Sequence, residues 1–345
     1  MTHLRIFRNA AAVGAIVLGC AAPAVNVPSP STPAPSAPAP SVAIALRPSP
    51  TVAQTAPPHD LAGQIGYSYT VGLDTHVPVI ANADGTNKRS PALAGRISPD
   101  GTRFLLFEAD GPNSGTGHAA TVGVDGSGYR PIPFSDPTLN YIPQVWSPDG
   151  KRIAFEGFDE SHPGRNGIYT ARASDGTHIV RVTAVTGRHD TPADYSPDGT
   201  QVVFFRAARE EPNADLGGTL WVVDIDGSDA QLIETPGVMP GPVADWSPDG
   251  SKILFCTARA QKTGALWTIE PDGSNLTKVF EDPEGGFAAW PVWSPDGSQI
   301  MFALDPIADW FSHPANGIYV INADGSGLAQ VIGGGQYKII SDWWE

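Results

Sequence analysis

Short, alternating runs of apolar residues fill the chain from residue 60 to its end. Typical examples are the runs 103–107 (RFLLF) and 299–302 (QIMF). Such short runs, rich in β-branched and aromatic residues, are typical of half-buried β-strands, in which successive side chains point to opposite faces. No run with the 3.6-residue period of an amphipathic helix competes with them. The pattern therefore predicts an all-β domain.

Turn motifs separate these runs at a nearly regular interval. Pro fixes φ at the first central position of a turn, Gly accepts the positive φ at which the chain reverses, and Asp bonds to nearby backbone N–H groups. The motif S-P-D-G occurs at Ser98–Gly101, Ser147–Gly150, Ser196–Gly199, Ser247–Gly250 and Ser294–Gly297, with spacings of 49, 49, 51 and 47 residues. Asp-Gly pairs followed by Ser or Thr begin at Asp84, Asp125, Asp175, Asp226, Asp272 and Asp324.

Each repeat is expected to hold four strands, in the order strand, S-P-D-G turn, strand, longer loop, strand, Asp-Gly turn, strand. Four antiparallel strands in a unit of just under 50 residues are typical of a β-propeller blade. Six Asp-Gly turns predict six blades. The first blade lacks an S-P-D-G motif, while the run 339–343 at the carboxyl end lacks the turn that should follow it. We expect this last strand to close the ring as the innermost strand of the first blade, which would hide the sheet edges.

The W-S-P-D-G and I-Y-x(4)-D-G-S elements resemble the repeats of the TolB-like (WD40-like) β-propeller family, and the resemblance covers residues 60–345. It implies a six-bladed propeller and a place in the bacterial cell envelope. The family's namesake also has an amino-terminal α/β domain, and here a linker stands in its place. The resemblance therefore implies the fold and the envelope context without specifying a partner.

The first 59 residues predict export and a tether. Residues 1–20 form a signal peptide, with Arg5 and Arg8 before the apolar run 10–18, and they end in a sequence that resembles a lipobox. In such signals Cys20 receives the lipid; the alternative is plain secretion, with cleavage in the Ala-rich segment 21–24. Residues 21–59 are rich in Pro, Ala and Ser and predict a disordered linker. We expect a protein on the outer side of the cell membrane that contacts the membrane through this lipid anchor only.

A net charge of −15 argues against nucleic-acid binding, because phosphate groups bind to positive surfaces. Neither a G-x-S-x-G nor an H-E-x-x-H motif nor a phosphate-binding loop occurs in the sequence. Cys256 lies in an apolar run and is expected to be a small core residue. We therefore expect no cofactor, apart from one structural cation considered below.

Candidate binding residues lie on the rim opposite to the short turns, because ligands are often bound by irregular loops on a rigid scaffold. That rim is expected to carry the loops 108–118, 158–166, 207–217 and 305–316 and the connectors 133–142, 184–192, 235–243 and 281–290. The candidates on it are Asn140, Tyr141, His162, His189, Asp190, Trp290 and His313. His162 and His313 lie in two similar S-H-P loops of opposite blades, so they form either a paired site or one inherited loop shape. For the others the alternative is ordinary loop chemistry.

Three carboxylates and three tryptophans add further hypotheses. Asp194, Asp245 and Asp342 each precede the aromatic residue of an innermost strand. They would hold a cation if they face the axis, since hard cations prefer oxygen ligands; alternatively they cap neighbouring backbone or pair with Arg96. The tryptophans that break the repeat pattern are expected to make exposed contacts: Trp290, Trp310 and Trp344.

Three functions remain open from the sequence. The first is a lipid-anchored binding or scaffold protein whose partner is a protein or glycan of the cell envelope. The second is an enzyme, a polysaccharide lyase or hydrolase with its active site at the channel mouth. The third is a passive surface protein. We favour the binding protein, and so expect no catalytic residues.

Overall fold

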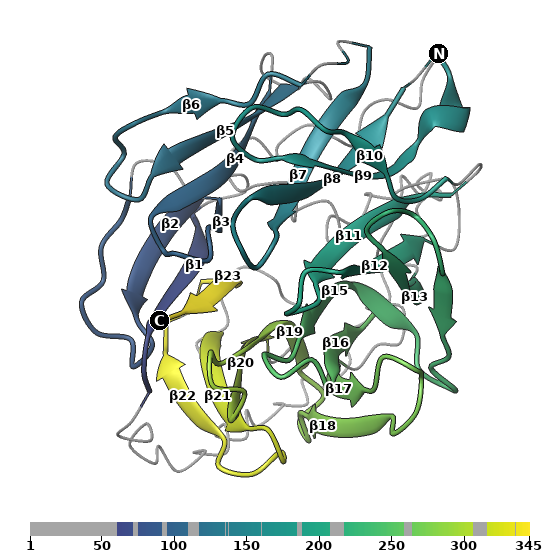
Figure 1. Ribbon diagram of the computed structural model, residues 1–345. Coiled ribbons are helices and arrows are strands. Elements are labelled where there is room, and N and C mark those ends of the chain that lie inside the picture. The colour runs from purple at the N-terminus through teal and green to yellow at the C-terminus, as the bar shows by residue number, and fades with distance from the viewer. Residues whose placement is uncertain are drawn as a thin grey trace, which may run out of the picture.

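Six small antiparallel sheets form a ring around a central axis in the computed structural model (Figure 1). The structure describes residues 61–71, 75–91, 95–109, 117–134, 136, 138–159, 161–184, 188–207, 217–258, 264–305, 316–334 and 336–345. The predicted signal peptide and linker lie outside these residues. Within the described residues no helix is long and apolar enough to cross a membrane.

Each sheet is one blade, and equivalent strands of the blades take equivalent places in the ring. The inner strands of blades 1 to 6 are β23 (Lys338–Trp344), β3 (Arg96–Ile97), β7 (Asn140–Trp146), β11 (Asp190–Tyr195), β15 (Pro240–Trp246) and β19 (Phe287–Trp293). The second strands are β1 (Gln64–Val71), β4 (Arg103–Ala109), β8 (Arg152–Phe158), β12 (Gln201–Ala207), β16 (Ile253–Thr257) and β20 (Gln299–Asp305). The third strands are β2 (Thr75–Asn82), β5 (Gly117–Gly123), β9 (Gly167–Arg172), β13 (Gly218–Asp224), β17 (Ala265–Ile269) and β21 (Gly317–Asn322). The outer strands of blades 2 to 6 are β6 (Arg130–Pro131), β10 (Val180–Arg181), β14 (Gln231–Ile233), β18 (Thr277–Glu281) and β22 (Ala329–Ile332).

This arrangement confirms the prediction of an all-β, six-bladed propeller. Blade 1 differs from the others, because its sheet has three strands and its fourth position is a single bridge between Ile80 and Arg89. The closing strand is also confirmed: β23 pairs with β1 as the innermost strand of blade 1. Trp343 fixes this closure further, since its indole Nε1–H donates to the Ala62 carbonyl at 2.8 Å.

The S-P-D-G motif folds the same way in each of its five copies, and blade 5 shows how. The Ser247 hydroxyl donates to Asp249 Oδ1 at 2.7 Å and accepts from the Lys252 N–H at 2.8 Å. Asp249 Oδ1 also accepts from the Ser251 N–H at 3.0 Å. Gly250 takes the positive φ, 75°, that the reversal requires. The turn is thus closed by its own side chains.

The S-P-D-G turns and the Asp-Gly turns connect the same ends of the strands, and we call this side the turn rim. The opposite side, which carries the loops between second and third strands and the connectors between blades, is the long-loop rim. Between the blades the core is apolar. One repeat position of the second strands contributes a fully buried ring in four blades: Phe155, Phe204, Phe255 and Phe302. Burial of each such ring stabilises the fold by about 1.5–3 kcal/mol. Cys256, at 4% exposure, lies in this core as predicted.

Candidate binding site on the long-loop rim

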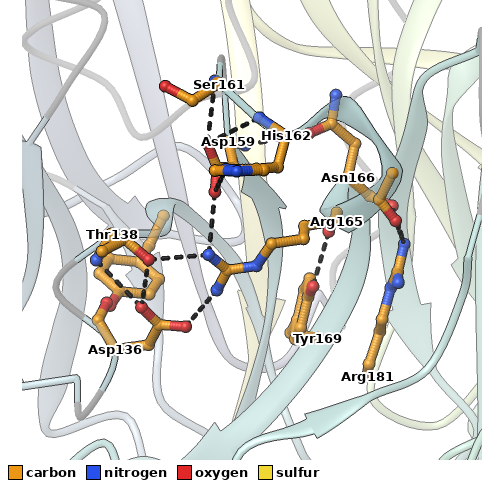
Figure 2. Close-up of polar contacts among 11 residues, drawn as sticks. Asp136, Thr138, Asp159, Ser161, His162, Arg165, Asn166, Tyr169 and Arg181 are labelled. Atoms are coloured by element: carbon orange, nitrogen blue, oxygen red, sulfur yellow. Dashed lines mark hydrogen bonds and ion pairs between the residues drawn. The ribbon is translucent and has the colours of Figure 1, made fainter.

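Two loops of blade 3 are joined by one arginine on the long-loop rim. Arg165 is the last residue of the short turn η2 (Pro163–Arg165) between β8 and β9. Its Nη1 donates to Asp159 Oδ2 at 2.9 Å and to Thr138 Oγ1 at 2.7 Å, while its Nη2 forms an ion pair with Asp136 (Figure 2). The loop between β8 and β9 is therefore tied to the connector that enters the blade.

Asp159 orders the loop from inside. Its carboxylate accepts the backbone N–H groups of Ser161 at 2.9 Å and His162 at 3.0 Å, and it contacts the His162 ring at 3.3 Å. Its own backbone N–H donates to Asn166 Oδ1 at 2.9 Å. The Asp159 side chain is 6% exposed, whereas the His162 side chain is 74% exposed. The buried acid thus holds the loop while His162 remains open to solvent.

Four aromatic rings pack beneath both loops, and we call them the aromatic floor: Phe134, Tyr141, Phe155 and Tyr169. Phe134 stacks on Tyr141 with 4.0 Å between ring centroids, and Phe155 stacks on Tyr169 at 5.7 Å. The Tyr141 hydroxyl donates to the Asp136 carbonyl, and the Tyr169 hydroxyl donates to the Arg165 carbonyl at 2.6 Å. Burial raises the pKa of Tyr141 to about 12, so this hydroxyl keeps its proton and remains a donor.

We call this assembly the blade-3 platform: Asp136, Thr138, Asp159 and residues 161–166. Arg181 completes it from the outer strand, since its Nη2 donates to the carbonyls of Gly164 and Asn166, each at 2.7 Å. Five residues of the platform are exposed, namely Thr138, Ser161, His162, Pro163 and Gly164. The platform is therefore a loop surface that is held in place by contacts within the chain.

Another ion pair of the long-loop rim lies where blade 3 meets blade 4. His189, with a 27% exposed side chain, forms an ion pair through Nδ1 with Glu156, which is 6% exposed. The negative charge of Glu156 raises the pKa of His189 to about 9, against the opposing effect of burial. The imidazole is therefore protonated at neutral pH, and both of its nitrogens are donors.

The next residue, Asp190, has a structural partner. Arg206 donates to both of its carboxylate oxygens, at 2.6 and 2.7 Å, and the guanidinium lies 4.5 Å from the centre of the Trp221 ring. The Asp190 side chain has no exposed surface. Asp190 is therefore part of the blade-4 scaffold and is closed to a ligand in this conformation.

The other predicted residues fall into several environments. Asn140 begins β7 and is partly buried, while Tyr141 is 8% exposed. The expectation that Trp290 and Trp344 make exposed contacts is wrong: they are 4% and 8% exposed. Trp290 has a φ of 56° in the irregular part of β19, packs in the core that joins blades 6 and 1, and donates from Nε1 to the Tyr337 hydroxyl at 2.8 Å. The remaining candidates lie outside the described residues: Cys20, Trp310 and His313.

The three axial carboxylates bind backbone groups of the next blade. Asp194 Oδ2 accepts the Trp246 N–H at 2.8 Å, and Asp245 Oδ2 accepts the Trp293 N–H at 2.7 Å. Asp342 Oδ2 accepts an N–H of β3 at 3.2 Å and lies 3.8 Å from Arg96 Nη1. The three carboxylates thus cap backbone N–H groups, and Asp342 also pairs with Arg96. Both contacts belong to the alternative to cation binding. Across the described part of the chain no group of three or more His, Cys, Asp or Glu side chains is placed to hold a metal ion.

Sequence reasoning missed Asp136, Arg165 and Glu156. Asp136 and Arg165 lie 29 residues apart, and Glu156 and His189 lie 33 residues apart, so neither pair forms a local motif. The one available indication was the placement of Asp136 and Arg165 in loops of the same repeat. Only the fold brings the members of each pair together.

No protein-family model matches the sequence, and neither does any curated protein. Solved structures do resemble the fold. A protein assigned as TolB from Agrobacterium tumefaciens matches with a TM-score of 0.57 and 18% identity, over 82% of this chain and 99% of that one. TolB from Acinetobacter baumannii matches with a TM-score of 0.59 and 18% identity, over 83% and 68% of the two chains. Oligogalacturonate lyase from Vibrio parahaemolyticus matches with a TM-score of 0.51 and 16% identity, over 75% and 71%. The chain therefore has the six-bladed β-propeller fold of the TolB proteins.

Proposed function

We propose that this chain is an exported, lipid-anchored binding protein of the bacterial cell envelope, and that its long-loop rim binds a protein or glycan. The observation that carries the proposal is the blade-3 platform. Its loops are fixed by Asp159, Arg165 and the aromatic floor, so little conformational entropy remains to be lost on binding. Rigid loops that present an exposed side chain on a stable scaffold favour recognition.

The export and anchoring part of the proposal depends on Cys20 and the preceding apolar run. If Cys20 carries the lipid, C20A abolishes metabolic labelling with a fatty-acid probe and releases the protein from the membrane fraction. Labelling that survives C20A would contradict the anchor. Release without any labelling of the wild type would leave plain secretion as the better description.

The binding face is tested by affinity capture from the envelope of the source bacterium with the full-length chain as bait. The platform variant is S161A/H162A, which changes two exposed side chains and spares the buried floor. The matched control is K151A on the turn rim, where the Lys151 side chain is 79% exposed. We expect one protein or glycan to be captured by wild type and K151A and lost with S161A/H162A. Equal capture by all three, or loss with K151A alone, would overturn the choice of rim.

A second candidate function, polysaccharide cleavage, is favoured by the His189–Glu156 pair on the same rim and by the fold likeness to an oligogalacturonate lyase. A protonated His189 would donate to a uronate carboxylate or a bridging oxygen. The net charge of −15 opposes it, because a polyanionic chain is repelled. Incubation with oligogalacturonate, followed by the ultraviolet absorbance of unsaturated products, separates the two functions. Activity that is lost in H189Q would favour the enzyme.

A further inference from the structure

The polypeptide enters the propeller on the turn rim. In four blades the carbonyl of the residue after the S-P-D-G motif accepts the N–H of a residue just before the Asp-Gly pair, at 2.8–3.0 Å: Thr102 from Val124, Lys151 from Ala173, Thr200 from Ile225 and Ser298 from Ala323. In blade 1 the Gly63 carbonyl accepts the Ala83 N–H at 3.0 Å in the same way. Gly63 therefore has the position that follows an S-P-D-G turn, although blade 1 lacks that motif.

This entry point is fixed by the carboxyl-terminal strand. The Ala62 carbonyl accepts the Trp343 indole N–H at 2.8 Å. Gly63 has a φ of 87°, and a Cβ at this position would lie 2.1 Å from the Trp344 carbonyl oxygen. Leu61 packs against the core that joins blades 6 and 1, where β23 lies beside β1 (Figure 1). The residues that precede Leu61 therefore join the propeller at one defined place on the turn rim.

The blade-3 platform lies at the other end of the strands. β1 begins at Gln64 on the turn rim and runs for eight residues, which corresponds to about 25 Å. Within blade 3, β8 separates Lys151, the equivalent of Gly63, from the platform residues 161–166. The attachment point of the predicted tether and the proposed binding surface are thus on opposite rims.

The turn rim is also strongly acidic. Its five S-P-D-G turns and six Asp-Gly turns each contribute one Asp, and ten of these eleven residues are exposed. Hydrogen bonds within the turns lower the pKa of all eleven carboxyl groups, so they are ionised at neutral pH. Anionic lipid headgroups repel such a surface, which keeps it from lying flat on a membrane.

We propose that this chain links two layers of the cell envelope: the tether leaves from the turn rim, the long-loop rim faces away from the anchoring membrane, and the partner belongs to a layer beyond that membrane. The inference rests on the proposed function, because it takes Cys20 as the anchor and the blade-3 platform as the binding surface. An extended linker of residues 21–59 would reach on the order of 100 Å. A partner inside the anchoring membrane would require the propeller to turn over on its tether.

The first test measures the height of each rim above a membrane. Full-length lipidated protein in vesicles of neutral and anionic phospholipid carries a dye at K151C or at H162C, and energy transfer to an acceptor-labelled lipid is recorded. Cys256 is buried, so the dye marks the introduced position. We expect more transfer from position 151 than from position 162. Equal transfer, or more transfer from position 162, would overturn the proposal.

The same vesicles separate this inference from the anchor itself. Adding C20A to either labelled protein should release it and abolish transfer. If the protein with Cys20 also fails to bind the vesicles, the anchor is wrong and the two-layer link fails with it. If that protein binds and both labels give equal transfer, the anchor stands and only the two-layer link is wrong.

A second test shortens the tether in living cells. With a photoreactive amino acid at position 162, deletion of residues 30–49 removes about half of the linker. We expect the crosslinked species to be lost while the amount of protein in the membrane fraction stays the same. A Pro- and Ala-rich segment of equal length and different order should restore the crosslink. Crosslinking that persists unchanged in the shortened chain would overturn the proposal.

Discussion

At the scale of single residues, charged side chains of the long-loop rim form pairs that join two strands, two loops or two blades. Arg165 joins the two loops of blade 3, Arg206 fixes Asp190 within blade 4, and His189 meets Glu156 between the two blades. Asp190 and Glu156 are almost fully buried, whereas Arg165 and Asp136 are both partly exposed. These pairs therefore hold the loops of the long-loop rim in place, and they also provide its charged side chains.

The His189–Glu156 pair gives a prediction about pH. In E156Q the pKa of His189 should fall from about 9 towards its ordinary value of 6.5, because the nearby negative charge is lost. A pKa raised by folding stabilises the folded state below the unfolded value, so this contribution is complete below about pH 6.5 and disappears as the pH rises through about 9. It amounts to about 3 kcal/mol at most.

An NMR titration of the imidazole protons measures this pKa directly. The conservative change keeps the size of the side chain at position 156, so the ring should stay in place. An unchanged titration in E156Q would show that Glu156 is not the source of the shift.

At the scale of the element, the S-P-D-G turn recurs in five of the six blades. Its hydroxyl–carboxylate bond recurs in all five copies, for example between Ser98 and Asp100 and between Ser294 and Asp296. The Ser side chain is buried in every copy, with an exposure of 3–4%. Each turn therefore contains a buried hydrogen bond whose donor and acceptor both come from the motif itself.

Removal of one such hydroxyl should weaken the fold by a measurable amount. S247A deletes the acceptor of the Lys252 N–H and the donor to Asp249, and we expect a loss of about 1–3 kcal/mol of unfolding free energy. S251A, which changes an exposed hydroxyl of the same turn, should cost less than about 0.5 kcal/mol. Urea denaturation of the two variants measures both values. Equal losses would mean that the buried position of Ser247 has no special part in the turn.

These local turns explain why the fold could be predicted from the sequence. Each S-P-D-G and Asp-Gly turn depends on residues within five positions, so its chemistry is visible in the chain. The site could not be predicted in the same way. Tyr141 and Trp290 were expected to meet a ligand, yet both are buried: Tyr141 packs on Phe134 and Phe155, and Trp290 lies in the core that joins blades 6 and 1. Asp136 and Arg165, which hold the blade-3 platform, become partners only through the packing of one blade.

At the scale of the whole molecule, closure of the ring depends on β23. This strand pairs with β1, and Asp342 and Ser341 on it contact blade 2 through Ile97 and Arg96. The two ends of the propeller chain thus meet in blade 1. That blade has three strands and one bridge, so a large part of its pairing comes from the carboxyl-terminal strand.

Deletion of residues 338–345 should therefore open the ring. The loss exposes the inner edge of β1 and apolar side chains that pack in the same core cluster as β23, such as Ile65, Tyr67 and Met301. We expect aggregation or a molten species in size-exclusion chromatography and near-ultraviolet circular dichroism. A monomeric, cooperatively unfolding deletion variant would show that closure by β23 is dispensable.

The central claim is that the long-loop rim, and not the turn rim, meets a partner in the envelope. The most direct measurement is photo-crosslinking in living cells, with a photoreactive amino acid placed at position 162 on the blade-3 platform or at position 151 on the turn rim. Both native side chains are exposed, so neither replacement disturbs the core. We predict a discrete crosslinked species from position 162 and none from position 151. Crosslinking from position 151 alone would contradict the account and move the binding surface to the turn rim.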